Sequence, residues 1–196
     1  AAVCWLFCPP IFRGGTIVAP PADGLRDPGR QVMWPVWSPY SFFPLYANAA
    51  NGGAGFAARQ LRADEVAGLP EMDRYLLART RRLVLAAEKS LNEFAISDAC
   101  DAVSDFIDVL TNWYIRNTRD RFWNEDASAF NTLYTVLEAF MRVLAPLAPM
   151  EAESVWRGLT GGESVHLADW PLAVDEQTGE DTVLGLVLVD VPALVE

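Results

Sequence analysis

The sequence predicts an all-α fold: an antiparallel helical bundle with an irregular N-terminal segment and a short extended tail. Between residues 71 and 160, apolar residues recur at three- and four-residue spacing, which is typical of amphipathic helices. Short connections separate these stretches and favour antiparallel neighbours. Prolines and glycines interrupt the first 70 residues instead. We therefore divide the chain into a linking segment (1–70), a helical bundle (71–160) and a closing segment with an acidic tail (161–196).

The linking segment contains one stretch, residues 31–50, that is aromatic and apolar enough to form a core helix. Pro35, Pro39 and Pro44 interrupt it, and a proline inside a helix removes a backbone donor and clashes with the preceding turn. We expect a broken or kinked helix here. Residues 51–70 are rich in Gly and Ala and should form a connector.

The first two bundle helices follow. The first should span about residues 72–91, and residues 92–95 should form the turn. Ser97 is a candidate N-cap for the second helix, which we expect from residue 98 to about residue 119. The apolar spacing of the first helix predicts that it buries Leu76, Leu83, Ala87 and Leu91.

The third helix and the closing segment complete the bundle. Ser128 is a candidate cap for the third helix, and a short fourth helix should span residues 151–159. Residues 163–171 read as an extended segment that ends in a turn, and the Val/Leu run beyond them as a strand or a helix. The third helix should bury Leu133, Val136, Leu137, Phe140 and Leu144.

The charge is unevenly distributed. The net charge of −11 argues against a free-standing nucleic-acid binder. Residues 1–123, however, carry 13 basic and 13 acidic side chains, whereas residues 151–196 carry one arginine and ten acidic side chains. No apolar run is long enough to span a bilayer, so we expect no membrane partner. The first residues lack both Met and the positive flank of a signal peptide, which indicates an internal cut from a longer protein.

Metal and catalytic sites are not evident. The odd number of cysteines, three, and the lack of a nearby His predict buried thiols in a reducing cytosol rather than a metal site. Asp101, Asp105 and Asp108 share a helix face, which we interpret as solvated or as facing the arginines at 79, 81 and 82. His166 is the only histidine and reads as a structural residue.

The run FIDVLTNWYIRNTRDRFW, residues 106–123, is the most informative stretch. Asn112, Arg116 and Arg119 share one helix face because they are spaced by four and three residues. Guanidinium forks beside aromatic rings suit phosphates and exposed bases. The alternative is a solvated helix end whose arginines are favoured by the helix dipole. The opposite, buried stripe would consist of Phe106, Ile107, Leu110 and Tyr114.

This run resembles the central helix of the anticodon-binding domain of isoleucyl-tRNA synthetases. Four further blocks resemble the same family in the same order: PVWSPYSFFPLYAN, MDRYLLARTRRLV, LAPLAPMEAESVWRGL and ESVHLADWP. Together with PPIFRGG near the start, they cover about residues 1–171. One departure is Asn117, which stands where the family usually has a second consecutive basic residue.

The resemblance implies that the chain binds the anticodon stem and loop of an isoleucine tRNA in the cytoplasm, and does not bind DNA. It also implies that Tyr114 and Trp123 support the helix from inside. The family's catalytic motifs are absent, so ATP and Mg²⁺ belong to the full-length enzyme and a separate catalytic domain is a further expected partner. The alternative is a non-catalytic protein–protein interaction module derived from the same fold, which the acidic tail favours. The residues carried over as candidates for tRNA contact, or for shaping that surface, are Asn112, Trp113, Arg116, Arg119 and Arg121.

Overall fold

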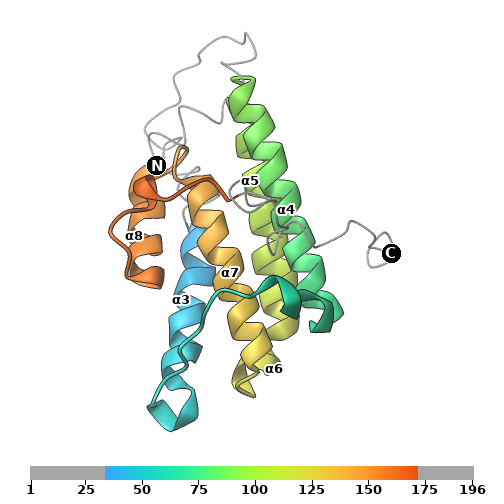
Figure 1. The fold of residues 1–196 in the computed structure, drawn as a ribbon, viewed down its shortest axis with the longest axis vertical. Helices are drawn as coiled ribbons and strands as arrows, with labels where there is room; N and C mark the ends of the chain where they lie inside the picture. The colour runs from blue at the N-terminus through green and yellow to red at the C-terminus, as the bar shows by residue number, and fades with distance from the viewer. Residues whose placement is uncertain (1–33, 172–196) are drawn as a thin grey trace.

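The computed structural model describes residues 34–171, and all regular structure in that range is helical. The all-α prediction is thereby confirmed. Successive long helical stretches, of which residues 96–123 form one, run in alternating directions along one long axis, as the colour gradient shows in Figure 1. Of the three cysteines predicted to be buried thiols, Cys100 is buried as a thiol, and Cys4 and Cys8 lie outside the described residues. The Val/Leu run of the tail also lies outside them.

Helix α3 (Trp34–Ala49) is unbroken, which contradicts the first of the two expected forms, a broken or a kinked helix. It is one helix that continues through Pro39 and Pro44. Its apolar face gives the physical reason, because Phe42 is buried and packs edge-to-face on Phe122, with ring centroids 5.0 Å apart. Aromatic packing of this kind offsets the backbone hydrogen bonds that the prolines remove.

The connector after α3 contains two short 3-10 turns, η4 (Asn51–Gly53) and η5 (Ala63–Gly68). It is held to the bundle by hydrogen bonds from its own backbone. The N–H of Leu61, for example, donates to Oγ1 of Thr135 at 2.9 Å. The connector therefore lies against the bundle, as Figure 1 shows.

Helices α4 (Glu71–Asn92) and α5 (Ile96–Asp108) form the first antiparallel pair. Leu76, Leu83 and Ala87 are buried as predicted, whereas Leu91 is only partly buried. The N-cap prediction was wrong, because α5 begins at Ile96 and Ser97 lies buried inside its first turn. The cap residue is Ala95, which makes no side-chain hydrogen bond to the helix.

The second bundle helix is longer than predicted. After α5 the chain continues as a π-helical segment, η6 (Val109–Ile115), and then as α6 (Arg116–Trp123). Phe106, Ile107, Leu110 and Tyr114 are buried, which confirms the predicted apolar stripe. π-helical turns occur often at functional sites, and this one contains two of the candidate residues.

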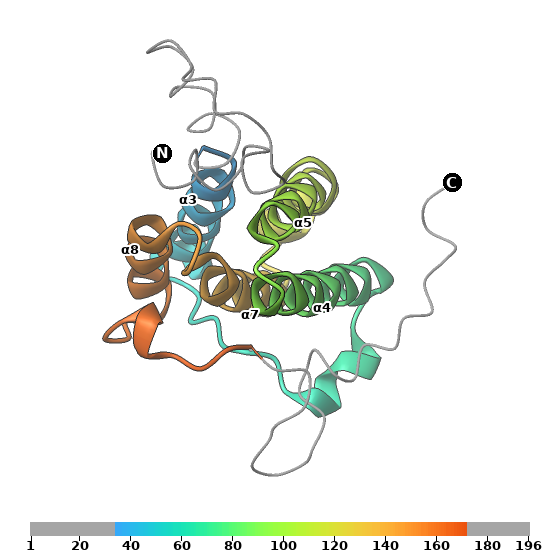
Figure 2. The same ribbon diagram turned by 90° about the horizontal axis from the view of Figure 1, so that it is seen from above.

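Helix α7 (Ala127–Leu144) lies at the centre of the bundle, between α4 and α8 in Figure 2. Thirteen of its 18 residues are buried, as expected of a helix that packs on several sides. They include the five apolar residues predicted for it. The N-cap is Asp126 rather than Ser128: the Asp126 carboxylate accepts a hydrogen bond from the Ser128 N–H at 2.9 Å.

Helix α8 (Pro149–Thr160) covers the other side of α7, and the closing segment contains one short turn, η7 (Val165–Leu167). Both N–H of Val165 and Oγ of Ser164 donate to the Glu153 carboxylate, at 2.9 and 3.0 Å. These two hydrogen bonds hold the segment 163–171 against α8. His166 lies exposed on this turn.

Candidate nucleic-acid interface

The candidate residues lie along η6 and α6 and separate into an exposed set and a buried set. Arg116 and Arg119 are exposed, and neither guanidinium makes a hydrogen bond or ion pair with any residue from 34 to 171. Their spacing of three residues places them on neighbouring turns of one face. Two unpaired guanidinium groups on neighbouring turns are an arrangement whose chemistry suits phosphate oxygens.

Trp123 lies on the same face. Its position differs from the one we predicted. We expected it to support the helix from inside, but its side chain is 76% exposed. Phe122, which is 1% exposed, fills the interior position instead. Because Trp123 lies four residues after Arg119, an open indole ring stands one turn from a free guanidinium. Tyr114 is fully buried, so the expectation for that residue is confirmed.

Asn112 and Trp113 lie one turn before Arg116. The Asn112 amide donates to Oδ1 of Asp108 at 2.5 Å and remains exposed. Trp113 is partly buried and packs on Tyr75 of α4, with ring centroids 4.7 Å apart. Trp113 therefore fixes η6 against α4, whereas Asn112 presents a polar group at the surface.

Arg121 lies in a partly buried network rather than on the open face. Its Nη1 and Nη2 donate to the two oxygens of Asp73 at 2.7 and 2.8 Å. Its Nε donates to Asp126 at 2.8 Å and its Nη2 also to Oγ of Ser128 at 2.8 Å. The hydroxyl of Tyr114 donates to the same Asp73 carboxylate at 2.8 Å. One guanidinium thus connects the start of α4, the end of α6 and the N-cap of α7.

The interactions within this network fix the protonation states of its members. Hydrogen bonds to Asp73 raise the pKa of the Arg121 guanidinium above its ordinary value. Burial raises the pKa of the Tyr114 hydroxyl well above its usual range, and the neighbouring Asp73 carboxylate adds to the rise. Burial would raise the pKa of Asp126, but hydrogen bonds from Ser128 and Arg121 lower it. Arg121 therefore stays charged and Tyr114 stays a hydrogen-bond donor at neutral pH.

Sequence reasoning missed Asp73 as the partner of Arg121. Asp73 is completely buried in the first turn of α4, 48 residues before Arg121. The spacing could have shown that Arg121 points inward, because it follows the buried Tyr114 by seven residues, which is two turns along the same helix face. The partner itself could not be found from helical periodicity, which relates residues only within one helix.

Two negative observations apply to residues 34–171. Within that range no group of three or more His, Cys, Asp or Glu side chains is placed to hold a metal ion. Asp101, Asp105 and Asp108 are exposed on α5. Among the same residues, no helix combines the length and hydropathy required to cross a bilayer.

Comparison with known proteins gives the family. Residues 73–189 match the family described as the anticodon-binding domain of tRNA ligase. The chain belongs to this family. The anticodon-binding match begins at Asp73 and includes η6, α6, α7 and α8, so every candidate residue lies within it.

Similar proteins include isoleucine–tRNA ligases from several bacteria. The enzyme of Bifidobacterium longum is 85% identical over all 196 residues, which are 18% of its length. The enzyme of Leifsonia xyli is 45% identical over 181 residues, 89% of this chain and 15% of that protein. That of Mycobacterium tuberculosis is 44% identical over 171 residues, 87% of this chain and 15% of that protein. The chain therefore spans less than a fifth of the length of these relatives.

Proposed function

We propose that this chain binds the anticodon stem and loop of an isoleucine tRNA as part of an isoleucine–tRNA ligase. The observation that carries the proposal is the anticodon-binding family match, which includes the helix with the unpaired Arg116 and Arg119. The relatives named isoleucine–tRNA ligase supply the amino-acid specificity of the proposal.

The side chains on the exposed face suit different parts of an RNA. Arg116 and Arg119 bind phosphate oxygens, which positions the RNA without reading its sequence. Trp123 offers an open ring on which an unstacked loop base can stack. Asn112 supplies an amide beside the arginines.

Arg121 and Trp113 support this face from inside the bundle. The guanidinium of Arg121 is occupied by Asp73, Asp126 and Ser128, and the ring of Trp113 packs on Tyr75. These contacts fix the orientation of η6 and α6 relative to α4 and α7. Both residues therefore shape the tRNA-binding surface, which is the second of the two roles expected for them.

The chemistry of aminoacylation lies elsewhere in the proposed enzyme. This chain contributes no catalytic residue in the proposal, and ATP and Mg²⁺ act at a separate catalytic domain, its second partner. The working compartment is the cytoplasm, where tRNA is charged. The chain's own role is to hold the anticodon end of the tRNA so that its acceptor end reaches that domain.

The test is binding of the chain to an isoleucine tRNA transcript and to an unrelated tRNA, at two salt concentrations. We expect binding that weakens with salt, because each phosphate contact releases counterions, and that favours the isoleucine tRNA. Replacing Arg116 and Arg119 together by Gln should weaken binding about tenfold and reduce the salt slope by about two. The matched control is R157Q on α8, an exposed arginine far along the chain from α6.

Two results would contradict the assignment. An unchanged salt slope in the double variant would show that Arg116 and Arg119 do not contact phosphates. Absence of binding at low salt would favour the second candidate, a helical protein–protein interaction module. The net charge of −11 favours that candidate, because it opposes association with RNA at long range.

A further inference from the structure

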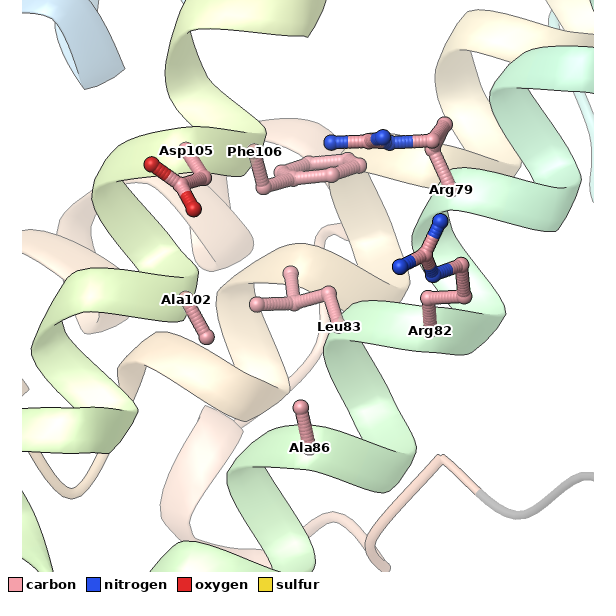
Figure 3. Close-up of a pocket in the computed structure, with 7 residues that line it drawn as sticks. All are labelled: Arg79, Arg82, Leu83, Ala86, Ala102, Asp105 and Phe106. Carbon is pink, nitrogen blue, oxygen red and sulfur yellow. The ribbon is translucent and has the colours of Figure 1, made fainter.

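A second cationic site lies between α4 and α5, away from the face of α6. It is a pocket of about 170 Å³, shown in Figure 3. Arg79 and Arg82 enter from α4 and Phe106 from α5, and Leu83 lies between the two helices. Asp105 lines the pocket from α5, but its carboxylate points away from the two guanidinium groups. The lining residues are Arg79, Arg82, Leu83, Ala86, Ala102, Asp105 and Phe106.

The two arginines have no polar partner among residues 34–171. Neither Arg79 nor Arg82 makes a hydrogen bond or ion pair with any residue in the described part of the chain, although Asp105 lines the same pocket. Their spacing of three residues on α4 places two like charges on adjacent turns, which slightly destabilises a helix. Although the chain has 26 acidic and 15 basic side chains, the donors of these two arginines are left open to an anion.

The pocket's chemistry fits a phosphate group. Two guanidinium groups provide up to ten N–H donors in planar forks, which match the oxygens of a phosphate. Leu83, Ala86 and Phe106 form an apolar wall, and an apolar wall strengthens a charge-assisted hydrogen bond by lowering the local dielectric constant. The single lining carboxylate, Asp105, opposes an anion.

We infer that Arg79 and Arg82 bind a phosphate of the RNA backbone and extend the binding surface along the α4–α5 groove. The inference rests on the proposed function. The Tyr75–Trp113 contact lies between the pocket and α6: Tyr75 precedes Arg79 by one turn, and Trp113 precedes Arg116 by one turn. One strand of RNA that follows this groove would meet both arginine pairs.

The first experiment uses tRNA binding by the whole chain. R79Q/R82Q should weaken the affinity for the isoleucine tRNA about five- to tenfold at low salt and reduce the salt slope by at least about one. D105N should strengthen binding about twofold, because it removes the opposing charge. R157Q, the control on α8, should reproduce neither effect, and circular dichroism melting should show that all variants are folded.

The second experiment uses inorganic phosphate alone and does not depend on tRNA binding. Phosphate added at constant ionic strength should shift the NMR signals of the Arg79 and Arg82 Nε–H groups, with saturation in the millimolar range, and should leave Arg157 unchanged. Shifts of Arg79 and Arg82 without any effect of R79Q/R82Q on tRNA affinity would assign the pocket to a free phosphate ester rather than RNA. If neither signal moves and tRNA binding of R79Q/R82Q equals that of R157Q, the inference is wrong while the proposed function stands.

Discussion

Arg121 shows how one residue can connect three helices. Its guanidinium uses four donors, of which two bind Asp73 on α4 and two bind the Asp126–Ser128 cap of α7. The Asp73 carboxylate also accepts from Tyr114, so its charge is compensated although it is completely buried. Buried ion pairs of this kind tolerate the loss of neither partner, because the remaining charge stays desolvated.

The first prediction is therefore that D73N strongly destabilises the fold. The substitution leaves Arg121 charged, partly buried and without its bidentate partner, so the free energy of unfolding should fall by about 3 kcal/mol. Urea denaturation monitored by circular dichroism measures this change. Y114F is the matched control: it removes one hydrogen bond to the same carboxylate and should cost about 1 kcal/mol. A D73N chain as stable as Y114F would show that the ion pair contributes little.

At the scale of the element, the helical stretch that ends at Trp123 agrees with its prediction in its buried stripe and differs in its length. The buried stripe of α5 and η6 follows from the spacing of Phe106, Leu110 and Tyr114, and it was found correctly. The π-helical segment could not be predicted, because no single residue in VLTNWYI marks it. The helix then extends to residue 123 and leaves the ring of Trp123 in solvent.

The second prediction is that W123A weakens tRNA binding without destabilising the chain. Stacking of a base on an aromatic ring contributes about 1–3 kcal/mol, so affinity should fall by a factor of about 5 to 160. Stability should change little, because the ring is 76% exposed and loses little packing when it is removed. Fluorescence anisotropy with a labelled anticodon stem-loop measures the affinity, and W123F should retain most of it.

The control for this prediction is F94A. Phe94 is 84% exposed in the turn between α4 and α5, so the substitution removes an equally open aromatic ring elsewhere in the bundle. Equal losses of affinity in W123A and F94A would mean that exposed aromatic rings contribute nonspecifically and that Trp123 has no particular role.

The other differences between prediction and structure arise where tertiary packing overrides a local sequence preference. Pro39 and Pro44 each carry a local penalty, yet α3 remains one helix because Phe42 packs into the core. Ser97 has the side chain of a cap but is buried one residue inside the helix start. Local signals placed the helices to within a few residues. They could not supply partners from other helices, such as Asp73 for Arg121.

At the scale of the whole molecule, the excess negative charge and the proposed RNA-binding surface lie in different parts of the sequence. Residues 1–123 are electrically neutral overall and contain both arginine pairs proposed to bind RNA. Residues 151–196 carry a net charge of −9. A negative field from that part of the chain opposes the approach of RNA over a Debye length, about 10 Å at 0.1 M salt, and weakens as salt increases.

The last prediction follows from that opposition. Neutralising four acidic residues in D175N/E176Q/E180Q/D181N changes the net charge from −11 to −7. The association rate with tRNA should rise about two- to fivefold at low salt and match the wild-type rate at high salt, because the effect is long-range and screened. Stopped-flow fluorescence measures it, and the charge-preserving variant D175E/E176D/E180D/D181E is the control. A rate unchanged at low salt would mean that this acidity does not act on RNA, and that a protein partner is the better explanation for it.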